Sequence, residues 1–204
     1  MTPRRTNASI GCDTAILIID VQVDFCWGGA LAVPAGDKVI PALNQVIRKA
    51  NRRNLRIYAS RDWHPAVSTH FKAWGGIWPV HCVADTPGAG FNDKLQLPVD
   101  TYIVSKGLKP DCNGYSVFDG RLADEMDFGR ALNKELITHL IVGGLATDYC
   151  VKRSVLDALK LGFAVTVLTD AIAAVERQAG DEQKALQEMH QAGADLANST
   201  TIAF

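Results

Sequence analysis

The stretch Ala15-Ile-Leu-Ile-Ile-Asp20 is a short, continuous apolar run that ends in a carboxylate. A run of this kind is typical of a strand that is buried on both faces of a parallel sheet. Comparable runs follow at 56–60, 101–105, 136–142 and 163–168, and segments with helical spacing separate most of them. The alternation predicts an α/β fold in three layers, with a mostly parallel central sheet and helices on both faces.

The helical spacing of apolar residues predicts helices at 37–53, 122–134, 148–161 and 181–192. Asp37 is expected to cap the first helix, and Gly162 to end the third. Gly143 and Gly144 are expected to close the strand at 136–142, and a short last strand is expected at 195–197.

The chain has 204 residues, which is enough for one domain. We expect a loose tail at 1–12 and a single domain at 13–204. Inside that domain, residues 61–100 have no regular period and contain four prolines, three histidines and three tryptophans. Long irregular segments in compact domains are usually functional, so we expect 61–100 to be a site-forming loop.

Composition excludes several classes of protein. The net charge is −1 and the pI is about 6.5, so the basic surface that nucleic acid requires is not expected. No apolar run approaches the roughly 20 residues of a membrane helix. Five cysteines at irregular spacing do not resemble a disulfide framework and favour a cytoplasmic location. We expect a small-molecule substrate as partner, and the sequence leaves a homo-oligomer open.

Three polar residues lie where predicted strands end. Asp20 closes the first strand, Lys106 follows the third, and Cys150 follows the fourth. Because parallel strands end at one edge of a sheet, these side chains can meet there as nucleophile, base and cation. Cys150 also lies near a predicted helix start, which would lower its pKa and favour the thiolate. Taken singly, each has a structural alternative: a core cysteine, a strand-end cap or a surface lysine.

A second group of polar residues lies in the 61–100 loop. Asp62 and His64 are two apart and point to one side of an extended chain, and His70 and His81 follow. A carboxylate with imidazoles is a ligand set for Zn²⁺, Fe²⁺ or Mn²⁺. The alternative is a set of scattered loop histidines. His139 and His190 stand apart, and we interpret both as structural.

Aromatic residues gather around the same part of the sequence, and they could form walls for a flat ring. Ordinary loop packing is the alternative for each of them. The set comprises Phe25, Trp27, Trp63, Phe71, Trp74, Trp78 and Tyr115.

Several motifs run through the chain in a characteristic order. They are Ile19-Asp-Val-Gln-Val-Asp-Phe-Cys-Trp-Gly-Gly-Ala-Leu31, Arg61-Asp-Trp-His64, Ser68-Thr-His-Phe71, Trp78-Pro-Val-His-Cys-Val83, Thr86-Pro-Gly-Ala-Gly90, Ser105-Lys-Gly107 and Gly143-Gly-Leu-Ala-Thr-Asp-Tyr-Cys-Val151. With them the chain resembles the nicotinamidases (pyrazinamidase type), within the isochorismatase-like cysteine hydrolases. The first and last motifs typify the superfamily, and the Asp-x-His and Trp-Pro-x-His-Cys elements select the nicotinamidases within it.

The resemblance implies roles for individual residues. The catalytic triad would be Asp20, Lys106 and Cys150, and the metal ligands would be Asp62, His64, His70 and His81. The peptide between Leu145 and Ala146 would be cis, and the N–H groups of Ala146 and Cys150 would form an oxyanion hole. Phe25, Leu31 and Trp78 would pack on a pyridine ring, with Tyr115 as a further contact. Val23 stands where the family commonly has a polar residue, and the hydroxyl of Ser68 could lie near the metal beside His70.

The activity implied by the resemblance is hydrolysis of nicotinamide to nicotinate and ammonia through a cysteine thioester. One divalent metal ion per chain (Zn, Fe or Mn) would orient the pyridine ring. Three alternatives remain open: an amidohydrolase of the same superfamily that acts on another small amide, a metal-dependent hydrolase that uses metal-bound hydroxide instead of Cys150 as nucleophile, and a ligand-binding or metal-storage protein without chemistry.

Overall fold

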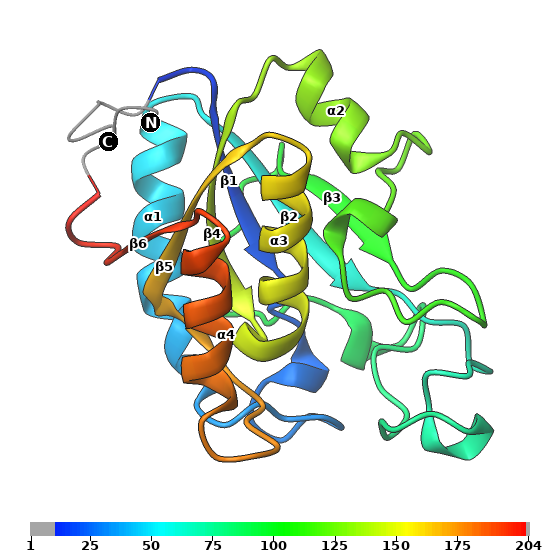
Figure 1. Ribbon diagram of the computed structural model, residues 1–204. Helices are drawn as coiled ribbons and strands as arrows, with labels where there is room; N and C mark the ends of the chain where they lie inside the picture. The colour runs from blue at the N-terminus through cyan, green and yellow to red at the C-terminus, as the bar shows by residue number, and fades with distance from the viewer. Residues whose placement is uncertain (1–10, 203–204) are drawn as a thin grey trace.

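A six-stranded parallel sheet forms the centre of the computed structural model, which describes residues 11–202 (Figure 1). The strands are β1 (Thr14–Ile19), β2 (Arg56–Asp62), β3 (Tyr102–Lys106), β4 (His139–Leu145), β5 (Ala164–Ala173) and β6 (Asp195–Ala197). They lie in the order β3-β2-β1-β4-β5-β6, so the direction of winding reverses between β1 and β4. The tail predicted at 1–12 falls outside the described residues, apart from residues 11 and 12.

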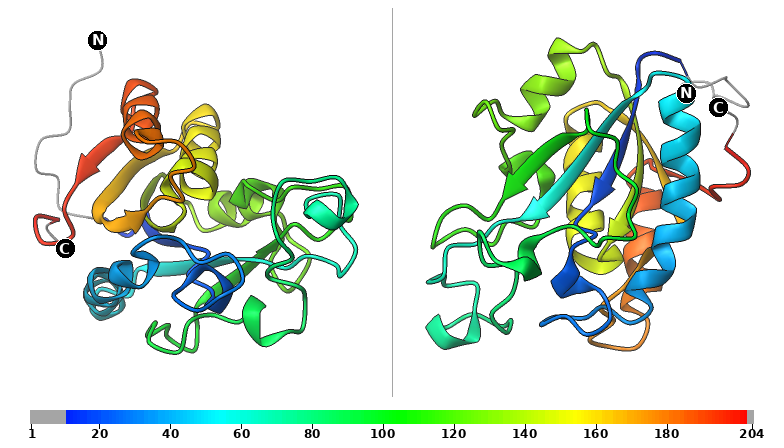
Figure 2. Two further views of the ribbon diagram at one scale, coloured as in Figure 1. Left: turned by 90° about the horizontal axis from the view of Figure 1, so that it is seen from below. Right: turned by 180° about the vertical axis from the view of Figure 1, so that it is seen from behind.

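Helices cover both faces of the sheet, which confirms the three-layer α/β prediction. They are α1 (Val39–Arg52), α2 (Phe128–Lys134), α3 (Lys152–Lys160) and α4 (Asp181–Gln191). Seen from below in Figure 2, the sheet lies between α1 on one side and α3 and α4 on the other. Alternate residues of β1 serve the two cores: Ile16 and Ile18 pack in the cluster with α1, and Leu17 and Ile19 in the cluster with α2, α3 and α4.

Several predicted boundaries are wrong, and long-range contacts explain them. Gly143 and Gly144 do not close β4 but continue it, because their backbones pair with Ile18 and Ile19 of β1. Asp37 does not cap α1, which begins at Val39 after a 3₁₀ turn. The Asp37 carboxylate instead accepts the N–H of Trp27 at 3.1 Å.

One predicted helix begins later than expected, and another begins with a π-helical turn. Residues 122–127 form turns, in which the N–H of Leu122 donates to the carbonyl of Met126, and α2 starts only at Phe128. The segment Thr147–Val151 is π-helical and leads directly into α3. Strands β2 and β5 run further than predicted, to Asp62 and Ala173.

The irregular segment that follows β2 lies beyond the arrowheads of β1, β2 and β3 (Figure 1). Its regular parts are two 3₁₀ turns, Lys72–Trp74 and Pro87–Ala89, and isolated bridges such as that between His64 and Val83. Within residues 11–202, no helix has both the length and the apolar character needed to cross a membrane.

Candidate active site

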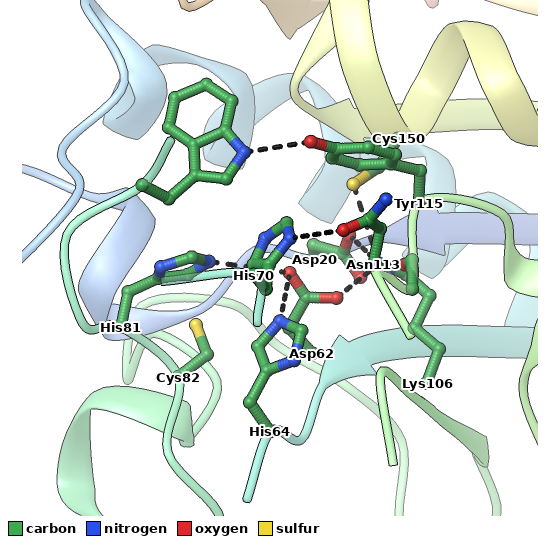
Figure 3. A network of polar contacts seen from close by, with 12 residues as sticks. Asp20, Asp62, His64, His70, His81, Cys82, Lys106, Asn113, Tyr115 and Cys150 are labelled. Atoms are coloured by element: carbon green, nitrogen blue, oxygen red, sulfur yellow. Dashed lines mark hydrogen bonds and ion pairs between the residues drawn. The ribbon is translucent and has the colours of Figure 1, made fainter. Parts of the chain in front are cut away.

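Four polar residues lie at the carboxyl ends of neighbouring strands. Asp20 directly follows β1, Asp62 and Lys106 are the last residues of β2 and β3, and Cys150 lies in the π-helical turn after β4. The winding reverses between β1 and β4, and ligands bind at such a reversal in open α/β sheets. The structure thus brings Asp20, Lys106 and Cys150 together as the sequence predicted, and adds Asp62 to them (Figure 3).

Lys106 is the centre of this group and is completely buried. Its Nζ lies 2.7 Å from Oδ2 of Asp20, 2.5 Å from Oδ1 of Asp62 and 3.5 Å from Sγ of Cys150. It also donates to the carbonyl of Gly114 at 2.7 Å. One ammonium group therefore offsets two buried carboxylates and touches the thiol.

Burial and the ion pairs set the protonation states. Burial alone would lower the pKa of Lys106, but Asp20 and Asp62 raise it well above its ordinary value. Burial would raise the pKa of Asp62, but Lys106 beside it holds that pKa below its ordinary value. Asp20 has its pKa raised by burial, which the attraction of Lys106 only partly offsets. The ammonium and the Asp62 carboxylate are therefore the stable charged forms.

The expected low pKa of Cys150 is wrong. Burial raises the pKa of this thiol well above its ordinary value, and the nearby charge of Lys106 offsets only part of that effect. Cys150 is only 6% exposed, and loss of hydration is the largest cause of its raised pKa. Cys150 is thus a thiol at rest and needs a base close by.

Asp20 is placed to be that base. A carboxylate oxygen of Asp20, one of Asp62 and the sulfur of Cys150 all lie within 4.8 Å of one another. The hydroxyl of Ser60 donates to Oδ1 of Asp20 at 2.7 Å, and the N–H of Asp20 donates to the carbonyl of Ser60 at 3.1 Å. Sequence reasoning missed Ser60, whose only signal was its place at the end of the neighbouring strand.

The three loop histidines form a second cluster beside the first. His64, His70 and His81 are buried, and each offers a ring nitrogen within 4.8 Å of the others (Figure 3). Nδ1 of His81 lies 2.8 Å from the carbonyl of Pro79, which can only accept a hydrogen bond. The proton therefore stays on Nδ1, and Nε2 keeps its lone pair.

These residues fit a divalent metal ion. Within residues 11–202, neither ring nitrogen of the fully buried His64 has a hydrogen-bond partner, which is rare for a buried polar group. Oδ2 of Asp62 faces Nε2 of His64 at 3.7 Å and Nε2 of His81 at 4.0 Å. Burial lowers the pKa of His70 to about 4 and also lowers that of His81, so both are neutral near pH 7 and can donate lone pairs.

Ser68 lies beside this cluster but is occupied by the backbone. Its hydroxyl donates to the carbonyl of Pro110 at 3.2 Å and accepts the N–H of His70 at 3.2 Å. This arrangement favours His70 over Ser68 as the fourth ligand. Gly107 passes so close to His64 that a Cβ would lie 2.4 Å from its Cε1, and its φ is +69°. Only glycine fits between β3 and the histidines.

A pocket lies above both clusters. Its walls include the four residues that the resemblance assigned to the ring, Phe25, Leu31, Trp78 and Tyr115. Asp62, His70, His81 and Cys150 also line it, whereas Asp20, Lys106 and His64 are fully buried beneath.

The aromatic prediction is wrong in part. Trp27 and Trp74 are 89% and 41% exposed and do not line the pocket, and Trp63 stacks on the guanidinium of Arg61 at 3.6 Å. Phe71 is buried and packs edge-on against His64. Tyr149, which sequence reasoning missed as a wall, lies 4.9 Å from Trp78 between ring centroids.

The turn after β4 has the cis peptide that the resemblance implied. The peptide bond between Leu145 and Ala146 is cis. Ala146 and Cys150 both line the pocket. His139 and His190 lie elsewhere, with Nε2 of His139 2.9 Å from the hydroxyl of Thr166 and Nδ1 of His190 3.1 Å from the carbonyl of Ala194.

Comparison with known proteins agrees with this geometry. The model of the isochorismatase domain family matches residues 14–201. Nicotinamidase of Escherichia coli is 39% identical over 198 residues, covering 89% of this chain and 93% of the relative. Nicotinamidase/pyrazinamidase of Mycobacterium tuberculosis is 33% identical over 91% of this chain and 99% of its own. Among solved structures, pyrazinamidase of Pyrococcus horikoshii in complex with zinc superimposes with a TM-score of 0.84 at 42% identity, covering 91% of this chain and 99% of that one.

Proposed function

This chain belongs to the isochorismatase family, and we propose that it is a nicotinamidase, which hydrolyses nicotinamide to nicotinate and ammonia. One observation supports this most strongly. A thiol, a carboxylate and an ammonium meet at the floor of an aromatic pocket whose side carries a histidine cluster. The thiol, the carboxylate and the ammonium can carry out acyl transfer. The aromatic walls and the histidine cluster suit a flat heteroaromatic amide.

The first half of the reaction is acylation of Cys150. Asp20 takes the proton from the thiol as the sulfur attacks the amide carbon, and a carbon–sulfur bond forms. Lys106 remains charged throughout, because its pKa is raised, and it stabilises negative charge on whichever neighbour carries it. Asp20 then gives the proton to the amide nitrogen, the carbon–nitrogen bond breaks, and ammonia leaves.

The oxygen of the tetrahedral intermediate needs donors. We assign that role to the backbone N–H groups of Ala146 and Cys150, which belong to the turn that lines the pocket. One donor of this kind typically contributes about 3 kcal/mol to the transition state.

The second half of the reaction is hydrolysis of the thioester. Asp20 takes a proton from water as the water oxygen attacks the thioester carbon. The carbon–sulfur bond breaks, the proton returns to Cys150, and nicotinate is released. Cys150 must remain a free thiol between turnovers, so we assign the enzyme to a reducing, cytoplasmic compartment.

Orientation of the ring is the task of the pocket walls and the histidine cluster. Phe25, Leu31, Trp78 and Tyr115 would hold the plane of the ring. Asp62, His64, His70 and His81 would hold a divalent ion, Zn²⁺, Fe²⁺ or Mn²⁺, whose chemistry when bound is to accept the lone pair of the pyridine nitrogen. Such positioning removes much of the entropic part of the barrier.

A second small amide, pyrazinamide, is the alternative substrate. A pyrazine ring is also flat and also presents a ring nitrogen, so the same walls suit it. Relatives named pyrazinamidase give a specific reason to test it.

The deciding experiment measures ammonia release from nicotinamide, pyrazinamide and an aliphatic amide by the purified protein and by Cys150→Ala. We expect the highest kcat/KM for nicotinamide, and a loss of at least about 1,000-fold in the variant, because the nucleophile is missing. Substantial turnover by Cys150→Ala would favour water as the nucleophile. No turnover of any amide by the wild-type protein would favour a binding or storage role.

A further inference from the structure

One short segment of the chain, residues 110–115, connects the parts of the site. It is fastened first to the segment that carries His70. The carbonyl of Pro110 accepts the N–H and the hydroxyl of Thr69 at 2.8 and 3.0 Å, and the hydroxyl of Ser68 at 3.2 Å. These hydrogen bonds therefore fix the position of the 110–115 segment relative to the loop that carries His70.

Three consecutive residues of this segment then contact three different parts of the site. Oδ1 of Asn113 lies 3.1 Å from Nδ1 of His70 (Figure 3). The carbonyl of Gly114 accepts from Lys106 at 2.7 Å. The hydroxyl of Tyr115 accepts from Nε1 of Trp78 at 2.9 Å. Gly114 permits this close passage, because its φ is +66° and a Cβ would lie 2.5 Å from the nitrogen of Gly107.

We propose that Asn113 is a positioning residue for the metal ion, acting through His70. The amide oxygen of Asn113 can only accept, so the proton of His70 stays on Nδ1 and the lone pair stays on Nε2. Partners of this kind fix both the tautomer and the orientation of a ligating histidine. The inference rests on the proposed function, because it needs the ion site.

The two other histidines do not need such a partner from this segment. His81 is held by a carbonyl of its own loop, that of Pro79. The ring of His64 is confined by Gly107 and stacks on His70 at 4.7 Å between centroids. His70 is thus the proposed ligand whose tautomer and orientation depend on a side chain from another loop.

Asn113 is also a residue that can be changed without disturbing the core. It is exposed, whereas His70 is only 4% exposed. Replacing Asn113 therefore removes an acceptor from His70 and leaves no cavity. The change should weaken binding of the ion and leave the stability of the metal-free fold unchanged.

The experiment titrates the metal-free protein with Zn²⁺ by calorimetry in wild type, Asn113→Ala, Asn113→Asp and Asn133→Ala. Asn133 is an exposed residue near the end of α2 and is the matched control. We expect Asn113→Ala to weaken binding by about 10-fold, at the lower end of the range for such partners, because water can replace part of the contact. Asn113→Asp keeps an acceptor and should bind at least as tightly as wild type, and Asn133→Ala should match wild type.

A second readout is the tautomer of His70, measured by nitrogen-15 NMR of the metal-free protein. We expect the Nδ1–H form in wild type and in Asn113→Asp, and a mixture in Asn113→Ala. Wild-type Zn²⁺ affinity together with an unchanged tautomer in Asn113→Ala would overturn this inference and leave the proposed function intact. Failure of wild type itself to bind Zn²⁺ would overturn the Zn²⁺ site and this inference with it, whereas the proposed hydrolysis is judged separately by ammonia release.

Discussion

Replacing Lys106 by Met should reveal how much of the site depends on one buried ammonium. Met has nearly the length of Lys but no charge, so the change removes the cation with little loss of volume. In wild type that cation is paired with Asp20 at 2.7 Å and with Asp62 at 2.5 Å. In Lys106→Met the two buried carboxylates would face each other alone, with oxygens within 4.8 Å.

The cost can be worked from that separation. Two unit charges about 4.8 Å apart repel by about 3.5 kcal/mol at an effective dielectric constant of about 20. Breaking a buried ion pair by removing one partner typically costs about 3–5 kcal/mol. We therefore expect the free energy of unfolding of the metal-free variant to fall by about 3–5 kcal/mol near pH 8.

The deficit should depend on pH with a definite sign. One carboxyl group can relieve the repulsion by taking up a proton, so its pKa in the folded variant rises above the unfolded value of about 3.9. Between those two pKa values the folded state binds more protons than the unfolded state, so stability falls as pH rises. The deficit relative to wild type should be small near pH 4 and should reach its full size above the raised pKa.

The assay is urea unfolding of chelator-treated wild type and Lys106→Met at several pH values from 5 to 8. Lys160→Met is the matched control, because the side chain of Lys160 is 70% exposed and lies 3.7 Å from Asp157. Its loss should be below about 1 kcal/mol at every pH. Wild-type stability of Lys106→Met near pH 8, or a deficit that does not change with pH, would refute the reasoning.

Two further perturbations test the ion site. Stripping the ion with a chelator should lower kcat/KM for nicotinamide by at least about 10-fold. Zn²⁺ or Mn²⁺ but not Mg²⁺ should restore kcat/KM, because imidazole ligands suit transition metals. Full activity after proven removal of metal would exclude the ion from the reaction. Gly107→Ala places a methyl 2.4 Å from His64, so it should weaken Zn²⁺ binding as well as cost about 1–3 kcal/mol of stability. Gly180→Ala has a comparable φ of +92° but nothing within 4 Å, so it should lose stability alone; equal Zn²⁺ affinities in the two variants would contradict the steric argument.

The strand ends were the most predictable part of the site. Asp20, Lys106 and Cys150 could be identified because each follows an apolar run, and parallel strands bring their carboxyl ends to one edge. The residues of the proposed ion site were predictable as a set of residue types, since the Asp-x-His spacing and the two later histidines lie in one irregular segment. Both inferences rest on local patterns that survive in the fold.

The remaining features depend on burial and on contacts between segments that are far apart in the sequence, and no local sequence pattern indicates either. The carbonyl of Gly114 has no side-chain signature, yet it holds Lys106. Asn113 is one polar loop residue among many, and only the folding of its segment onto 68–70 brings it to His70. The place of Cys150 near a helix start indicated a low pKa, whereas burial of the thiol in the pocket wall raises that pKa.

Asp62 explains why the two clusters should be treated as one charged unit. Its Oδ1 contacts Lys106, and its Oδ2 faces two histidines. Without an ion, the carboxylates of Asp20 and Asp62 together outweigh the single charge of Lys106, and burial lowers the pKa of His70 and of His81, so neither supplies a positive charge near pH 7. A buried excess of negative charge is unfavourable, so a divalent cation beside Asp62 would stabilise the site as well as orient the ring. Loss of Lys106 and loss of the ion should therefore each increase the cost of the other, which is why the Lys106→Met experiment must be run on metal-free protein.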